Sequence, residues 1–158
     1  MINVDKALEY VRSHHTEFLD ELKEFVSIPS VSTDISAKAD TQKAAEWVAK
    51  KLRKLGIENI TIFPTKGHPV VYGEYLKAGE NKPTVLVYGH YDVQPAEPLE
   101  LWRTPAFEPT QVGENLFGRG ASDMKGQITA SLQAIEAIVQ TDSIPVNIKF
   151  MIEGEEEI

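Results

Sequence analysis

The sequence predicts an α/β domain with α/β/α layers around a mixed, partly parallel sheet. Two predominantly apolar runs, residues 84–88 and 146–152, flank one amphipathic segment at residues 126–139, which is the pattern of a β-α-β crossover. Two further segments rich in β-branched and aromatic residues lie either side of a short turn, which favours neighbouring antiparallel strands. The length of 158 residues suits one core, because a chain of about 150 residues buries roughly 70% of its unfolded surface.

Three helices are expected. Apolar residues spaced about 3.6 apart predict the first over residues 5–26, and Pro29 ends it. The second has an apolar stripe, and Gly56 follows it where a left-handed cap is expected. The third covers residues 126–139. The stripe of the second helix consists of Ala44, Ala45, Val48, Leu52 and Leu55.

The strands follow from composition and turns. Residues 57–64 and 70–76 predict two neighbouring strands around the turn at residues 66–69. Residues 84–88 form a short, mostly apolar run, which predicts a central strand covered on both faces. The connection at residues 89–124 is far longer than the usual length of about 4–6 residues. Its aromatic residues and a predicted hairpin at residues 113–115 indicate an ordered loop with a function.

Composition excludes several classes of function. The net charge is −8, which disfavours nucleic acid and anionic membranes as partners. The chain has no cysteine, so a metal would be held by His, Asp and Glu alone. Before Pro29 there is no uninterrupted apolar run, so we expect neither a signal peptide nor a membrane span. We therefore expect the protein to be cytoplasmic.

Acidic and imidazole residues gather in three segments, residues 89–92, 118–123 and 153–157. Each is expected at the carboxyl end of a strand or the start of a helix, where α/β sheets bind ligands. Taken singly, each has an ordinary structural explanation: turn chemistry, a helix cap and a solvated acidic tail. Taken together they supply one imidazole and several carboxylates, which suits zinc or another divalent cation.

These segments resemble the M20 family of zinc metallopeptidases in residue type, order and spacing. The dipeptidase branch, which includes carnosine and non-specific dipeptidases, is the more similar because the chain has Tyr-Asp-Val-Gln at residues 91–94. The resemblance spans nearly the whole chain. It is based on residues 27–32, 89–95, 102–109, 118–126 and 153–157.

The resemblance implies a role for each site residue. His90 would bind one zinc, Glu157 the other, and Asp123 would bridge both. The catalytic residues would be Asp92, which orients His90, and Glu156, the general base. Two zinc ions would complete the site, with Mn or Co as alternatives, and a cis peptide bond would follow Asp123. Glu155 receives no role.

The resemblance also implies that residues 1–158 are the amino-terminal part of a catalytic domain and are incomplete. Members of the family have a further acidic ligand, a further His and an inserted domain that forms a homodimer and contacts the substrate. None of these is in the sequence, so we expect the 158 residues alone to be inactive.

Three functions remain open from the sequence. The first is a two-zinc hydrolase of dipeptides or similar amides. The second is an N-acyl amino acid deacylase, which would use the same metal core on a different substrate. The third is a non-catalytic acidic fragment that binds a cation. Small peptides or N-acyl amino acids are the expected substrates.

Overall fold

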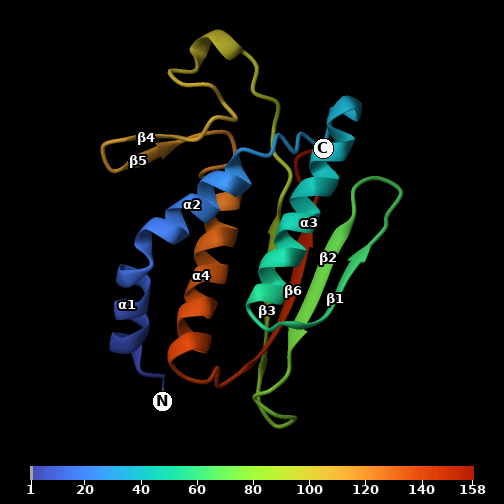
Figure 1. The fold of residues 1–158 in the computed structure, drawn as a ribbon. Coiled ribbons are helices and arrows are strands. Elements are labelled where there is room, and N and C mark those ends of the chain that lie inside the picture. Colours follow the sequence, from blue (N-terminus) through green and yellow to red (C-terminus); the bar gives the residue numbers. More distant parts are fainter. Residues whose placement is uncertain (1) are drawn as a thin grey trace.

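In residues 2–158, which the computed structural model describes, α-helices accompany a four-stranded sheet and a two-stranded one (Figure 1). Two short 3-10 helices, η1 and η2, lie in the loops. The elements in chain order are α1 (Val4–Ser13), α2 (His15–Val26), η1 (Ile35–Ala37), α3 (Lys38–Lys54), β1 (Glu58–Phe63), β2 (Val70–Tyr75), β3 (Thr84–His90), η2 (Leu99–Leu101), β4 (Thr110–Val112), β5 (Asn115–Phe117), α4 (Lys125–Thr141) and β6 (Asn147–Glu153).

The first predicted helix is in fact two helices that meet at His14. The backbone of His14 leaves the helical region, with φ −107° and ψ 14°, and its ring Nδ1 lies 2.9 Å from the carbonyl oxygen of Tyr10. The single helix predicted over residues 5–26 is therefore wrong at this point. The break lets both α1 and α2 follow α4, which each of them contacts.

Helix α3 matches its prediction. Every residue of the predicted stripe is at most 3% exposed. Gly56 has φ +72° and ends the helix with two backbone hydrogen bonds, Gly56 N–H to Arg53 and Ile57 N–H to Leu52. This pair of bonds is a Schellman cap, in which glycine is favoured because it adopts positive φ without strain.

The sheet is mixed and partly parallel, as predicted. Its strand order is β1-β2-β6-β3. Strand β2 pairs antiparallel with both β1 and β6, whereas β3 and β6 are parallel and joined through α4. The parallel register places His90 opposite Glu153. The carboxyl ends of β3 and β6 therefore lie side by side.

Strand β3 is at the edge of the described sheet, so the prediction of a central strand is wrong for residues 2–158. Its side chains alternate, and Gly89 lies against Ile128 of α4. On the opposite face Leu86 is 57% exposed and Tyr88 47% exposed. A continuous apolar run indicates that both faces will be covered, but it does not say by which residues. Strand β6 takes the central position.

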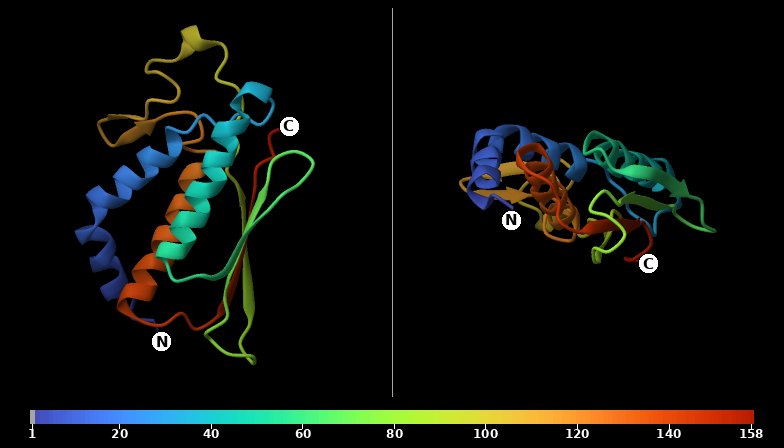
Figure 2. Two further views of the ribbon diagram at one scale, coloured as in Figure 1. Left: turned by 45° about the vertical axis from the view of Figure 1, so that its right-hand side comes forward. Right: turned by 90° about the horizontal axis from the view of Figure 1, so that it is seen from below.

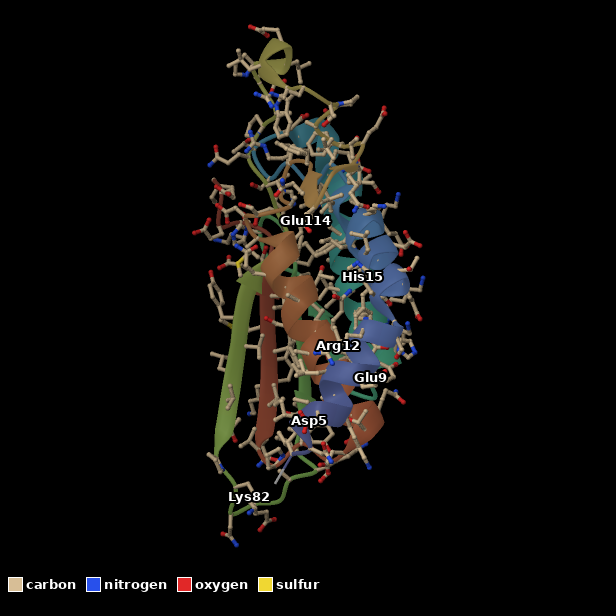
Figure 3. The ribbon with its side chains drawn as sticks, turned by 90° about the vertical axis from the view of Figure 1, so that its left-hand side faces the viewer. Asp5, Glu9, Arg12, His15, Lys82 and Glu114 are labelled. Carbon is tan, nitrogen blue, oxygen red and sulfur yellow. The ribbon has the colours of Figure 1, made fainter. Side chains whose placement is uncertain are left out.

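The four α-helices of the described residues all lie on one face of the four-stranded sheet (Figures 2 and 3). Helices α3 and α4 cover the sheet, and α1 and α2 pack outside α4. The core between these layers includes Leu52, Leu132 and Phe150, each at most 1% exposed. The described residues thus supply the sheet and one helical side of the predicted α/β/α arrangement. The second helical layer remains a prediction.

The long connection after β3 is ordered and extends away from the body of the molecule (Figure 1). It contains the predicted hairpin, formed by β4 and β5 with Gly113 at φ +62°. The indole Nε1 of Trp102 donates to the carbonyl of Ala96 at 2.7 Å, which ties the loop together. No helix among the described residues has the length and apolar character to cross a membrane.

Candidate metal centre

The parallel pairing of β3 and β6 brings two of the three polar segments together. Beyond the paired residues His90 and Glu153, the N–H of Tyr91 donates to the carbonyl of Glu153 at 2.8 Å. The ring of Tyr91 lies against Gly154, where a Cβ atom would come within 2.4 Å of it. The absence of a side chain at residue 154 therefore lets residues 153–157, the acidic segment, turn across the end of β3.

Asp92 is the buried centre of this arrangement. Its side chain is 0% exposed. Its two carboxylate oxygens accept the backbone N–H groups of Glu156 at 3.3 Å and Glu157 at 3.0 Å. One of the same oxygens lies 3.3 Å from Nδ1 of His90. Asp92 thus fixes the acidic segment and the imidazole ring in relation to each other.

The ring of His90 is oriented with Nε2 toward the open side of the site. Nδ1 faces two acceptors, the carboxylate and the carbonyl oxygen of Asp92, the latter at 3.1 Å. These acceptors favour the proton on Nδ1, so that Nε2 of the neutral ring carries the lone pair. Nε2 lies 3.3 Å from Oδ1 of Asp123 and 3.8 Å from Oε2 of Glu156.

The charges around His90 have opposing effects on its pKa. Burial disfavours the charged ring and by itself lowers the pKa, but the hydrogen bond and negative charge of Asp92, with Glu156 adding to them, outweigh burial and raise it to about 9. For Asp92, burial raises the pKa, and His90 and the N–H of Glu157 reverse this, leaving the pKa below its ordinary value. The site therefore has a negative potential that favours a cation.

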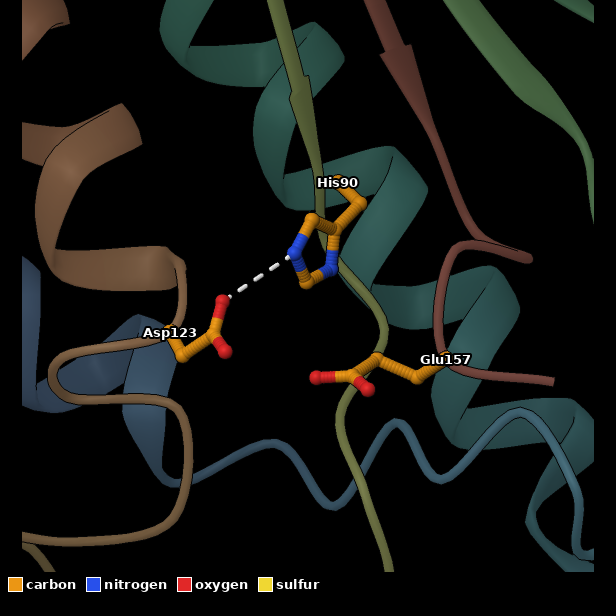
Figure 4. A group of neighbouring side chains, drawn as sticks. All are labelled: His90, Asp123 and Glu157. Carbon is orange, nitrogen blue, oxygen red and sulfur yellow. Dashed lines mark ion pairs between the residues drawn. The ribbon is translucent and has the colours of Figure 1, made fainter.

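Asp123 comes from the loop just before α4 and lies across the site from His90 and Glu157 (Figure 4). Gly120 in this loop has φ +84°, and the peptide bond between Asp123 and Met124 is cis, as the sequence resemblance implied. Gly126 allows the loop to approach the helix closely, because a Cβ there would lie 2.1 Å from the carbonyl oxygen of Ala121. The exposed side chain of Asp123 points at His90.

Glu157 completes the group from the acidic segment. One ligand atom from each of His90, Asp123 and Glu157 lies within 4.8 Å of the others. Gln94, which belongs to the Tyr-Asp-Val-Gln segment but had no predicted role in the site, donates from Nε2 to Oε2 of Glu157 at 2.5 Å. The alternation along residues 90, 92 and 94 is the signal that would have found it.

The structure thus brings together all five predicted site residues, His90, Asp92, Asp123, Glu156 and Glu157. Glu155, which received no role, turns away toward the hairpin of β1 and β2, where the Thr65 hydroxyl donates to it at 3.4 Å. One imidazole and several carboxylates converging around an open space form a donor set that fits zinc or a similar divalent cation. A cation would also replace the proton that these acids draw onto His90.

Known proteins resemble this chain in both sequence and fold. Residues 86–158 match the family described as Peptidase family M20/M25/M40. Over 98% of the present chain, the sequence is 38% identical to the Beta-Ala-His dipeptidase of Mus musculus. Over 99% of the present chain, it is 35% identical to the Cys-Gly metallodipeptidase dug1 of Schizosaccharomyces pombe. The crystal structure of human carnosine dipeptidase 1 superposes on 97% of the chain with a TM-score of 0.87 and 34% identity.

The matched region is only a part of each of these proteins. The chain spans 34% of the mouse protein, 35% of the yeast protein and 35% of the human crystal structure. It therefore covers about a third of the length of the curated relatives that it matches.

Proposed function

We propose that this chain, a relative of the M20-family metallodipeptidases, forms one side of a two-metal site that hydrolyses dipeptides. The observation that carries the proposal is the convergence of ligand atoms of His90, Asp123 and Glu157 within 4.8 Å of one another. The Asp92 carboxylate contacts Nδ1, the ring nitrogen of His90 that faces away from this group. A carboxylate behind a metal-binding His is a common feature of zinc sites. We assign one metal to His90, the other to Glu157, and both to Asp123.

Bound divalent cations would polarise the scissile carbonyl and lower the pKa of an attacking water to about 7. Glu156 would take one proton from that water as its oxygen attacks the carbonyl carbon. When the C–N bond breaks, Glu156 would pass the proton to the leaving amine. Its carboxylate, 3.8 Å from Nε2 of His90, faces the space where this exchange would occur. We expect zinc, with Mn or Co as functional substitutes.

The general-base assignment is tested by two neighbouring substitutions in the full-length protein. Glu156→Gln should reduce kcat for dipeptides by about 100- to 10,000-fold, the usual contribution of a general base. It should leave bound zinc, measured by elemental analysis, unchanged. Glu155→Gln is the matched control, because Glu155 turns toward Thr65 and should retain activity. Full turnover by Glu156→Gln would contradict the assignment.

The substrate class is tested with the same preparations. The relatives are named for β-Ala-His and Cys-Gly dipeptides, so we expect turnover of dipeptides to exceed that of N-acetyl amino acids. Faster release of acetate from N-acetyl amino acids than of amino acids from dipeptides would favour a deacylase instead.

Residues 1–158 by themselves should not be active. A catalytic zinc usually has about three protein ligands, whereas His90 and Glu157 give each metal one ligand besides the shared Asp123. We propose that the remaining ligands, and a domain that forms a homodimer, belong to the other two thirds seen in the relatives. After dialysis, a protein of residues 1–158 should retain little zinc and show no dipeptide hydrolysis. Two tightly held zinc ions with turnover would refute this.

A further inference from the structure

Lys125 is a buried lysine that the proposed chemistry does not use. It is the first residue of α4 and is 0% exposed. Its Nζ donates to two backbone carbonyls, that of Phe25 at 3.1 Å and that of Ile28 at 2.6 Å. It also lies 5.1 Å from the centre of the Phe25 ring. A buried amino group requires such partners, because burying a charged group without them is strongly unfavourable.

The carbonyls that Lys125 binds lie at and just after the end of α2, and the residues that follow pack against the segment that holds Asp92. Ser30, which is fully buried, donates from its hydroxyl to the carbonyl of Tyr91 at 2.6 Å. The N–H of Val93 donates to the carbonyl of Ser30 at 3.0 Å, and Val31 forms a parallel bridge with Val93. Ser30 and Val31, which closely follow the carbonyls that Lys125 binds, therefore pack against residues 91–93.

The other end of Lys125 belongs to the loop that holds Asp123. Asp123 is two residues before Lys125 in the sequence. The side-chain stem of Lys125 lies under Gly120, where a Cβ atom would be 3.3 Å from Cδ of Lys125 and 2.7 Å from Val93. The side-chain stem of Lys125 thus packs on residues 120–123, the Asp123 loop. Its amino group is bonded to the carbonyls of Phe25 and Ile28, next to the residues that pack against the Asp92 segment.

We propose that Lys125 is a positioning residue that holds the Asp123 loop and the His90–Asp92 loop at the separation required for binding the metal pair. The proposal rests on the proposed function, because it assumes that these loops supply metal ligands. A lysine near the end of a helix can also act only as a cap for its last carbonyls. The two roles differ in one measurable way, since a simple cap would change stability without changing metal affinity in the folded protein.

The test is Lys125→Met in the full-length protein, which keeps an apolar stem and removes the amino group. Zinc affinity is measured by competition with a chromophoric chelator, and the coordination geometry by the visible spectrum of the Co²⁺-substituted protein. We expect affinity to fall by about 10- to 100-fold, as it does when partners behind metal ligands are removed. We also expect the Co²⁺ spectrum to change.

The matched control is Lys51→Met. Lys51 is the other buried lysine of the described residues, at 4% exposure, and it bonds Glu21 and Glu136 between the helices. Its loss should destabilise the fold but leave the zinc affinity and Co²⁺ spectrum of the folded protein unchanged.

The outcomes separate this inference from the proposed function. If the wild-type protein binds no zinc, both fail. If the wild type binds zinc and Lys125→Met binds it equally well with the same Co²⁺ spectrum, the inference alone is overturned. If Lys125→Met does not fold, Ser30→Ala tests the same connection by removing the bond to Tyr91. A loss of about 10-fold in zinc affinity would support the proposal, and unchanged affinity would overturn it.

Discussion

At the scale of single residues, Asp92 shows how one carboxylate can organise a site without occupying it. Both of its oxygens accept backbone N–H groups of the acidic segment, and one also faces the ring of His90. Such charge-assisted bonds are stronger than neutral ones and are directional. The position of Glu157 and the rotation of His90 therefore depend on the same side chain.

Asp92→Asn should weaken zinc binding by about 10- to 100-fold, the range for partners behind metal ligands. An asparagine has one acceptor oxygen, so its NH₂ group would face either a backbone N–H or Nδ1 of His90. Chelator competition measures the change. Asp142→Asn is the matched control, because Asp142 also accepts two backbone N–H groups, at 3.0 and 2.8 Å, on an exposed loop at the end of α4. Equal affinities in all three proteins would contradict the prediction.

At the scale of elements, the start of α4 opposes the usual preference of helices for alanine. Replacing glycine by alanine in a helix stabilises it by up to about 1 kcal/mol. At Gly126 the new Cβ would lie 2.1 Å from the carbonyl oxygen of Ala121, a distance that requires the backbone to move. The loop before α4 and the helix itself can approach this closely only with glycine.

Gly126→Ala should therefore destabilise the protein, by about 1–3 kcal/mol as for other overpacked sites. It should also weaken zinc binding because the Asp123 loop must shift. Urea unfolding measures the first effect and chelator competition the second. Ser131→Ala, at an exposed position of the same helix, should instead follow helix propensity and keep or slightly raise stability. If Gly126→Ala instead raised the free energy of unfolding, the loop before α4 would be able to move without destabilising the protein, and the prediction would be wrong.

The helices are also joined by a group of charged side chains. Glu21 of α2 accepts from Lys51 at 2.6 Å and from Lys54 at 2.9 Å, both of α3. Glu136 of α4 also bonds Lys51. Burial by itself would raise the pKa of Glu21, but the two lysines outweigh it and the pKa lies below its ordinary value of 4.5. Glu21 is thus a stabilising group whose contribution depends on pH.

Glu21→Gln should lower the free energy of unfolding at pH 7 by about 1.5–3 kcal/mol, the range for hydrogen bonds to charged groups. Because the pKa is lower in the folded state, the contribution is present above about pH 4.5 and is lost as pH falls through the folded pKa. The difference between variant and wild type should therefore shrink on acidification, as measured by urea unfolding at several pH values. Glu9→Gln, at an exposed pair with Arg12 at 3.9 Å, should change stability very little. A Glu21→Gln difference that stays constant with pH would contradict this account.

At the scale of the whole molecule, one face of the sheet has no helix from the described residues. Apolar side chains on this face include Leu86 and Tyr88 of β3, Met151 of β6 and Phe63 of β1, each at least 40% exposed. Strand β3 also has one side unpaired within residues 2–158. Exposed apolar faces and open strand edges both promote association with other chains.

A protein of residues 1–158 should therefore self-associate despite its charge of −8. Sedimentation velocity over a range of concentrations should show species larger than a monomer. Leu86→Lys with Tyr88→Lys, which places charges on β3, should shift the population toward monomer. Lys77→Glu, in an exposed ion pair with Glu58 beyond the end of β2, is the control. A wild-type chain that stays monomeric at high concentration would refute the prediction.

Local sequence was sufficient for much of this protein. The buried stripe and cap of α3, the antiparallel β1 and β2, and the succession of β3, α4 and β6 depend on periodicity and turn residues, which act over a few positions. The three polar segments also stood out, because each adjoins a strand end or a helix start. Their gathering into one site followed from the parallel order of the strands.

Other features depend on contacts between residues far apart in the sequence. No local pattern in the sequence predicts the break at His14 or the edge position of β3. The same is true of the bonds from Asp92 to the acidic segment and of the burial of Lys51 and Lys125. Lys125 lies 97 residues from the carbonyl of Ile28 that it binds. Periodicity reports which face of an element will be covered, whereas the partner that covers it, and the polar groups that must be satisfied there, are decided only when the elements pack.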